Sequence, residues 1–424
     1  MSSRKPALGF IFVTLLLDVL GFGLIIPVGP KLVQHLQGGG EQEAAGAVGL
    51  LAATYALMQF LFAPLLGVLS DRFGRRPVLL ISVFGSGVDY FAMSIAPTVG
   101  WLFVTRALNG LSGASMTAAN AYIADVTPPE KRAAGFGMAG AAFGLGFVLG
   151  PLIGGILGKY DIHYPFYAAG GLTLLNWLYG YFLLPESLPP VRHHSISLRR
   201  ANPIGAFSGL AKYPMVLGLS ASFFMINLAQ FSLHATWVLY TGHKFGWGPM
   251  EVGLSLFTVG VCAAIVQGGL VRRVIPRLGE RASMLIGITI AALSYFGYGA
   301  ATQGWMIYAI VAFGCLGGLA LPAAQSIISR SVPRDQQGTV QGALSSLQSV
   351  ANVIGPLIGA SSFAFFISDK APFQLPGAPL YASAILSFFG LLIAYAVLNR
   401  HAPPPLTQQA ASEEPHPGDT PSAG

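Results

Sequence analysis

Charged residues are scarce in this chain of 424 residues. It contains 23 Lys and Arg and 16 Asp and Glu, which together make up 9% of the sequence. A soluble domain carries about 25% charged residues, so this composition excludes an ordinary water-exposed surface. Hydrophobic residues make up 53% of the chain, and the mean hydropathy is +0.63. The composition therefore predicts a protein that crosses a membrane many times.

Cysteine and the usual catalytic patterns are also lacking. The two cysteines, Cys262 and Cys315, lie in separate apolar stretches, which excludes a disulfide framework and disfavours a thiolate metal site. The sequence has no paired carboxylates, no nucleophile with a neighbouring base and no phosphate-binding loop. The adjacent His193 and His194 would bind a metal only weakly. We therefore predict a protein that is not an enzyme and that holds no metal or cofactor.

Long apolar stretches predict an all-α membrane protein with twelve transmembrane helices. Their approximate limits are 7–29, 44–69, 77–96, 100–124, 134–157, 164–184, 213–241, 250–275, 282–302, 304–329, 338–367 and 378–398.

Basic residues gather on one side of these predicted helices. With the N-terminus inside, 18 of the 23 Lys and Arg lie in inner loops or tails. Four lie in outer loops (Lys31, Lys159, Lys244 and Lys370), and Arg106 lies within a helix. Because positive charge favours the cytoplasmic side of a membrane, we expect both termini in the cytoplasm. The net charge of +7 then reflects topology and not nucleic-acid binding.

The sequence repeats at a shift of 205 positions. Residues Gly150-Pro151-Leu152-Ile153-Gly154 align with Gly355-Pro356-Leu357-Ile358-Gly359. Six helices return the chain to the same side of a membrane, so the repeat is parallel, and such repeats place substrates near the midplane between them. The predicted parts are an N-terminal six-helix half (1–184), a cytoplasmic linker (185–212), a C-terminal six-helix half (213–398) and a disordered cytoplasmic tail (399–424).

Two strings carry recognisable chemistry. The loop after the second predicted helix reads Gly67-Val-Leu-Ser-Asp71-Arg72-Phe-Gly74-Arg75-Arg76-Pro77. Its arginines alone would orient the helices in the membrane, so the carboxylate of Asp71 indicates a further role. The fifth predicted helix contains Gly146-Phe-Val-Leu-Gly150-Pro151-Leu-Ile-Gly154-Gly155. Small residues at this spacing let helices approach closely, so packing alone also explains the second string.

These strings resemble the major facilitator superfamily and its drug:proton antiporters, and the first half most resembles the tetracycline efflux transporters. The resemblance implies a major facilitator fold, a proton gradient in place of a cofactor, and a monomer in the inner membrane. It implies a conformational latch formed by Asp71, Arg72, Gly74, Arg75 and Asp125. It also implies an antiporter motif formed by Gly146, Gly150, Pro151, Gly154 and Gly155.

The second half departs from that family. The tetracycline exporters have a carboxylate in helix 9 and a His in helix 8, and the corresponding helices here have neither. This departure leaves open whether tetracycline itself is a substrate.

Three charged residues fall well away from the ends of predicted helices. A charge there costs several kcal/mol, so each of them indicates a functional role. Asp89 and Arg106 lie about 10 Å and 9 Å from the same end of neighbouring helices, so we expect a structural ion pair, with a direct role in proton coupling as the alternative. Asp18 lies about 16 Å deep, and no basic residue of the sequence matches that depth. We predict that Asp18 carries the coupled proton; a permanently neutral carboxyl group is the alternative.

Neutral polar residues are the candidate substrate contacts: Gln59, Asn109, Asn120, Asn227, Gln230, His234, Gln267 and Gln325. Aromatic residues would form an apolar wall around them: Phe223, Phe224, Phe231, Trp237 and Tyr240. Each of these also fits simple helix packing. As a set they favour a large amphipathic substrate.

The sequence therefore favours a proton-coupled antiporter that exports drugs or related, tetracycline-like molecules across the cytoplasmic membrane by alternating access. Its partners would be a small-molecule substrate, protons and the lipid bilayer. The alternatives are an exporter or symporter of an endogenous metabolite or siderophore, and a membrane receptor that transports nothing.

Overall fold

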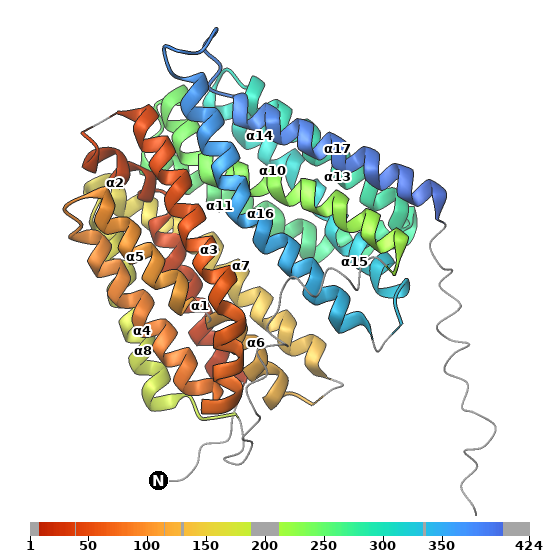
Figure 1. The fold of residues 1–424 in the computed structure, drawn as a ribbon, viewed down its shortest axis with the longest axis horizontal. Coiled ribbons are helices and arrows are strands. Elements are labelled where there is room, and N and C mark those ends of the chain that lie inside the picture. Colours follow the sequence, from red (N-terminus) through yellow and green to blue (C-terminus); the bar gives the residue numbers. More distant parts are fainter. Residues whose placement is uncertain are drawn as a thin grey trace, which may run out of the picture.

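A computed structural model of the chain describes residues 8–38, 40–113, 115–128, 131–187, 212–333 and 336–401. These residues form helices, and none of them forms a β-strand (Figure 1). Most of the predicted linker and nearly all of the predicted tail, together with His193 and His194, lie outside the described residues.

The first group of helices, called here the N-terminal group, comprises α1 (Leu8–Ile25), α2 (Gly29–Leu36), α3 (Glu41–Phe73), α4 (Arg75–Ser94), α5 (Val99–Ser112), α6 (Ser115–Val126), α7 (Arg132–Tyr160) and α8 (Tyr164–Leu183). The second, the C-terminal group, comprises α10 (Pro214–Phe245), α11 (Pro249–Ile265), the π-helix η3 (Val266–Leu270), α12 (Val271–Leu278), α13 (Glu280–Ala300), α14 (Gly304–Gly314), the 3₁₀-helix η4 (Cys315–Leu319), α15 (Ala320–Arg330), α16 (Gln337–Phe366) and α17 (Ala378–Arg400).

Ten helical stretches of the described residues are long and apolar enough to cross a membrane. They correspond to ten of the predicted helices, and α8 matches the predicted 164–184. The continuous helix predicted at 100–124 is wrong, because the helix is interrupted at Gly113, between α5 and α6. The first predicted helix also ends early, at Ile25, since Pro27 lacks the backbone N–H that would extend it.

Two irregular points in the helices are each bridged by a glutamine from a neighbouring helix. Gln59 Nε2 donates to the carbonyl oxygen of Gly113 at 3.1 Å, where α5 ends. Gln267 Nε2, from the π-helix η3, donates to the carbonyl oxygen of Gly318 in the 3₁₀-helix η4 at 3.4 Å. A helix that changes its winding leaves carbonyl groups without their usual partners, so these side chains satisfy part of the loss.

The helices form two neighbouring bundles, which Figure 1 shows in red to yellow and in green to blue. In the N-terminal group, α1 packs on α7 and α8, α3 on α5, and α4 on α8. In the C-terminal group, α10 packs on α16 and α17, and α13 packs on α15 and α17. The groups meet where α3 packs on α16 and α7 packs on α11.

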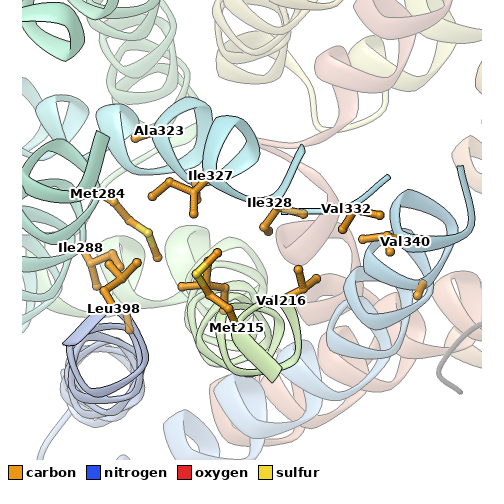
Figure 2. Close-up of a cluster of buried hydrophobic side chains, with 14 residues drawn as sticks. Met215, Val216, Met284, Ile288, Ala323, Ile327, Ile328, Val332, Val340 and Leu398 are labelled. Atoms are coloured by element: carbon orange, nitrogen blue, oxygen red, sulfur yellow. The ribbon is translucent and has the colours of Figure 1, made fainter. Parts of the chain in front are cut away.

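Buried apolar side chains fix one end of the C-terminal group. Figure 2 shows a cluster in which Met215 from α10, Met284 from α13 and Ile327 from α15 lie together, and Val340 and Leu398 bring in α16 and α17. Five helices therefore converge on one well-packed patch. Inside a membrane such packing holds helices together mainly by van der Waals contact.

Glycines of α7 let two neighbouring helices approach very closely. A methyl group on Gly150 would lie 2.7 Å from the Cα atom of Gly23 in α1. A methyl group on Gly155 would lie 2.5 Å from the carbonyl oxygen of Pro249, which begins α11 of the other group. Because real Cβ atoms do not come this close, the backbone of α7 reaches these two points only because it presents hydrogen there in place of a side chain.

We predict that Gly150→Ala destabilises the protein by about 1–3 kcal/mol, because the added methyl group forces α1 away from α7. Gly144→Ala on the same helix is the matched control, since a methyl group there meets nothing within 4 Å. Thermal unfolding in detergent measures the difference. Equal stability of the two variants would contradict the packing described here.

Candidate functional site

An ion pair lies buried between α4 and α5. Arg106 Nη2 pairs with Asp89 Oδ2, and Asn109 Nδ2 donates to the same oxygen at 2.6 Å. Ser86 Oγ in turn donates to Asn109 Oδ1 at 3.3 Å. The short turn between the helices thus brings Asp89 and Arg106 together. Asn109 belongs to this pair and does not line the cavity described below.

A tyrosine connects this pair to Asp18. The Arg106 guanidinium lies over the ring of Tyr55 in α3, 5.7 Å from its centre. Tyr55 is within electrostatic range of both Arg106 and Asp18, and Tyr90 in α4 is within range of Asp18. Asp18, Tyr55, Tyr90, Asp89 and Arg106 form one polar cluster within the N-terminal group.

A second charged cluster lies at the junction of α3, α4 and α6. Arg75 Nη1 pairs with Asp71 Oδ1 at 2.5 Å, and Arg75 Nε pairs with Asp125 Oδ2 at 3.1 Å. Three members of the predicted latch are thus in contact. Arg72 is not among them: it is exposed, and its guanidinium lies 5.4 Å from the centre of the Phe73 ring.

Glu186, which the sequence reading assigned to the linker, completes this cluster. Its two carboxylate oxygens accept from the backbone N–H of Arg75 at 2.9 Å and of Arg76 at 3.2 Å. A carboxylate at this place satisfies free N–H groups and complements the positive end of α4. Gly74 has a φ of 105°, and a methyl group there would collide with the Glu186 carboxylate. The only sequence signal was a carboxylate directly after the apolar stretch of α8.

Polar contacts join the two groups on the opposite side of the molecule. Lys31 Nζ, in α2, donates to the carbonyl oxygen of Trp247 at 3.2 Å. Glu41 Oε2, at the start of α3, lies 2.5 Å from His243 Nδ1 near the end of α10. Burial lowers the pKa of Lys31, and the nearby Glu251 carboxylate opposes part of that effect. The groups are therefore closed together on this side.

A cavity of about 540 Å³ lies between the groups, mostly within the C-terminal one. None of the described residues that line it is Asp, Glu, Lys or Arg. Its polar side chains are neutral: Asn227, Gln230, His234, Ser294, Tyr295 and Tyr298. Its aromatic wall includes Phe223 and Trp237 from α10, Phe22 from α1 and Phe147 from α7. Phe22 stands one helical turn, about 6 Å, from Asp18 on α1.

The cavity separates the predicted substrate contacts into two sets. Asn227, Gln230 and His234 line it, as do Phe223 and Trp237. The other predicted contacts do not: Gln59, Asn109, Asn120, Gln267, Gln325, Phe224, Phe231 and Tyr240. Gln59 and Gln267 bridge helix irregularities, Asn120 and Gln325 are exposed, and Tyr240 is buried with its hydroxyl donating to the Tyr298 carbonyl oxygen.

Sequence reasoning missed Tyr295, Tyr298, Phe22 and Phe147 as cavity residues. The two tyrosines lie in α13, a helix without internal charge. Polar hydroxyl groups in such a helix were the signal in the sequence that could have indicated a cavity there. Among the described residues, no group of three or more His, Cys, Asp and Glu is placed to hold a metal ion.

Comparison with known proteins identifies the family to which this chain is similar. Residues 11–356 and 270–420 match the family model of the Major Facilitator Superfamily. The chain is 40% identical to the tetracycline resistance protein, class C, of Escherichia coli over 84% of its own length and 90% of that protein. It is 39% identical to the class G protein of Vibrio anguillarum over 80% and 86% of the two lengths.

A solved structure agrees on the fold. The structure matches the crystal structure of the human organic anion transporter MFSD10 (TETRAN) with a TM-score of 0.64 and 24% identity, over 91% of this chain and 98% of that one. The family model and the two relatives confirm the resemblance expected from the sequence motifs. The chain belongs to the major facilitator superfamily of membrane transporters and is not an enzyme.

Proposed function

We propose that the chain is a proton-coupled antiporter that exports amphipathic, tetracycline-like small molecules across the cytoplasmic membrane. One observation carries the proposal: an apolar, charge-free cavity between the helix groups stands one turn of α1 from the membrane-embedded carboxylate of Asp18. The relatives named as tetracycline resistance proteins support export of such a molecule. A proton gradient would supply the energy, with no cofactor and no second subunit.

The proposed architecture is twelve membrane-spanning helices in two parallel, repeated halves, 1–184 and 213–398. In it, α5 and α6 together form one span, and α8 forms another. A shift of 205 positions carries Gly113 onto Gly318, and a glutamine bridges the chain at each. It also carries Pro151 onto Pro356, whose carbonyl oxygens each face a glycine of the opposite group. These paired features support the repeat.

We assign the side of Arg75 to the cytoplasm, together with both termini, because basic loop residues concentrate there. The contacts of Lys31 with Trp247 and of Glu41 with His243 then close the outer side. In this account the structure is an inward-facing state. The Asp71–Arg75–Asp125 cluster would engage the C-terminal half only when the cytoplasmic side closes, as a latch for the outward-facing state.

Coupling would follow from competition between a proton on Asp18 and substrate in the cavity. Substrate entering from the cytoplasm contacts Phe22, one turn from Asp18, and favours release of the proton inward. After substrate leaves outward, Asp18 takes up a proton from the outer side and the transporter returns. The inward movement of protons down their gradient thereby drives the outward movement of substrate.

For Asp18→Asn we expect a loss of gradient-driven export of at least tenfold, because amide nitrogen and oxygen carry no exchangeable charge at neutral pH. Substrate exchange at equal pH on both sides should persist. The assay is tetracycline transport in liposomes with and without an imposed pH gradient, with Asp369→Asn, in an exposed loop, as the control. Full stimulation of Asp18→Asn by the gradient would refute the assignment.

For the buried pair, Arg106→Ala should lower stability by about 3–5 kcal/mol, since it leaves the Asp89 carboxylate buried without its cation. The double variant Asp89→Asn with Arg106→Gln removes both charges, and we expect it to recover most of the stability lost in Arg106→Ala. Thermal unfolding in detergent measures both. A double variant no more stable than Arg106→Ala would show that the pair is not the source of the loss.

The direction of transport separates the alternatives. Accumulation inside inverted vesicles indicates export, and depletion from them indicates an uptake symporter. A receptor would move no substrate in either direction. A panel that includes siderophores and endogenous metabolites would reveal a substrate other than a drug.

A further inference from the structure

We infer that Cys262 and Cys315 together form a dithiol site that binds aryl compounds of trivalent arsenic, with the aryl group in the cavity. The inference concerns binding alone and does not rest on the proposed export function. It depends on two features, which are the placement of the two thiol groups and the apolar wall beside them.

Folding brings the two cysteines together, although they lie in separate apolar stretches of the sequence. Cys315, the first residue of η4, donates through its Sγ atom to the carbonyl oxygen of Val259 in α11 at 3.7 Å. Val259 lies one turn before Cys262, on the same face of α11. The Cys315 thiol also lies within hydrogen-bonding distance of the Cys262 thiol. Both thiols are free, so the structure contains a pair of them, one from each of two neighbouring helices.

This pair borders the cavity. Cys315 lines it, and so do Val259 and Ala263, the residues one turn before and directly after Cys262 on α11. Tyr298 lines the same wall and is within electrostatic range of both thiols. Neither cysteine is fully buried. A ligand that enters the cavity therefore reaches the pair, and it meets an aromatic ring beside it.

The number of thiols indicates the class of ligand. Trivalent arsenic forms three single bonds, and in an aryl arsenical one of them goes to carbon, so two thiols complete its coordination. Inorganic arsenite would need a third donor. The chain has no other cysteine, and within its described part no group of three or more His, Cys, Asp and Glu could hold a metal ion. The site therefore suits the organic arsenical, whose aryl group packs against the apolar wall at Tyr298 and Trp237.

The binding reaction is a condensation. In phenylarsine oxide the arsenic–oxygen bond is replaced by two arsenic–sulfur bonds, and the oxygen leaves as water with the two thiol protons. Neither arsenic nor sulfur changes its oxidation state, so no oxidant or reductant is consumed. The second arsenic–sulfur bond forms within one molecule, at a high effective concentration of the second thiol. Such a linkage strengthens binding by about 100-fold or more over a single thiol.

Phenylarsine oxide tests the site on the full chain, purified in detergent with a phosphine reductant. We expect intact-protein mass spectrometry to show one arsenical per chain, which ethanedithiol removes and 2-mercaptoethanol does not. In calorimetric titrations, Cys262→Ser and Cys315→Ser should each bind about 100-fold more weakly. Each variant exchanges only sulfur for oxygen, and thermal unfolding checks that it is folded. Two arsenicals per chain, no binding at all, or an unchanged affinity in either variant would overturn the inference.

A variant with the same two thiols, one of them displaced, tests their placement. The double variant Val261→Cys with Cys262→Val exchanges two neighbouring residues and turns one thiol by about 100° around α11. Val261 is exposed, so its position lies off the face that meets Cys315. We expect this variant to bind phenylarsine oxide as weakly as the single-thiol variants. Binding as tight as that of the unaltered protein would show that the pairing of the thiols is not the cause.

A larger side chain in the wall tests the position of the aryl group. Ala263→Leu fills the cavity beside the pair, and we expect it to weaken binding of phenylarsine oxide about tenfold. Ala264→Leu is the matched control, since Ala264 is exposed and does not line the cavity. Equal affinities of these two variants would overturn the placement of the aryl group. Binding as predicted by a chain that exports nothing in liposomes would refute the proposed function and leave this inference standing.

Discussion

The cost of an unpaired charge inside a membrane governs the arrangement of this protein. It accounts for the scarcity of charge in the sequence, and it explains why Asp89 and Arg106 are paired and further bonded through Asn109. It also separates two kinds of chemistry. The N-terminal group holds the embedded carboxylates, whereas the cavity, mostly in the C-terminal group, is lined by neutral side chains. In the proposed mechanism, the proton site and the substrate site are therefore separate but neighbouring.

Helix α7 connects these two sites mechanically. Its glycines contact α1, which carries Asp18 and Phe22, and they contact the start of α11, which belongs to the other group. In the proposed mechanism, a change around Asp18 would be transmitted through these close backbone contacts to the boundary between the groups. The glycine string of the predicted antiporter motif thus forms one contact between the groups, and α3 with α16 forms another.

Hydropathy and a short turn predicted much of this arrangement. Apolar length located nearly all of the helices, and the turn before Val99 was enough to bring Asp89 and Arg106 together. The interruption at Gly113 was not predicted, because the apolar stretch continues through it and the Gln59 side chain that bonds the Gly113 carbonyl oxygen comes from another helix. Tyr55 and Glu186 were missed for the same reason. Each acts on residues far away in the chain, and only the packing of the helices reveals those neighbours.

The proposed coupling requires that substrate in the cavity and a proton on Asp18 exclude one another. The most direct measurement is the number of protons released when tetracycline binds to the purified protein in weakly buffered detergent solution, followed with a pH indicator. We expect proton release near neutral pH from the unaltered protein and none from Asp18→Asn. Equal release from both proteins, or no release from either while tetracycline binds, would contradict it.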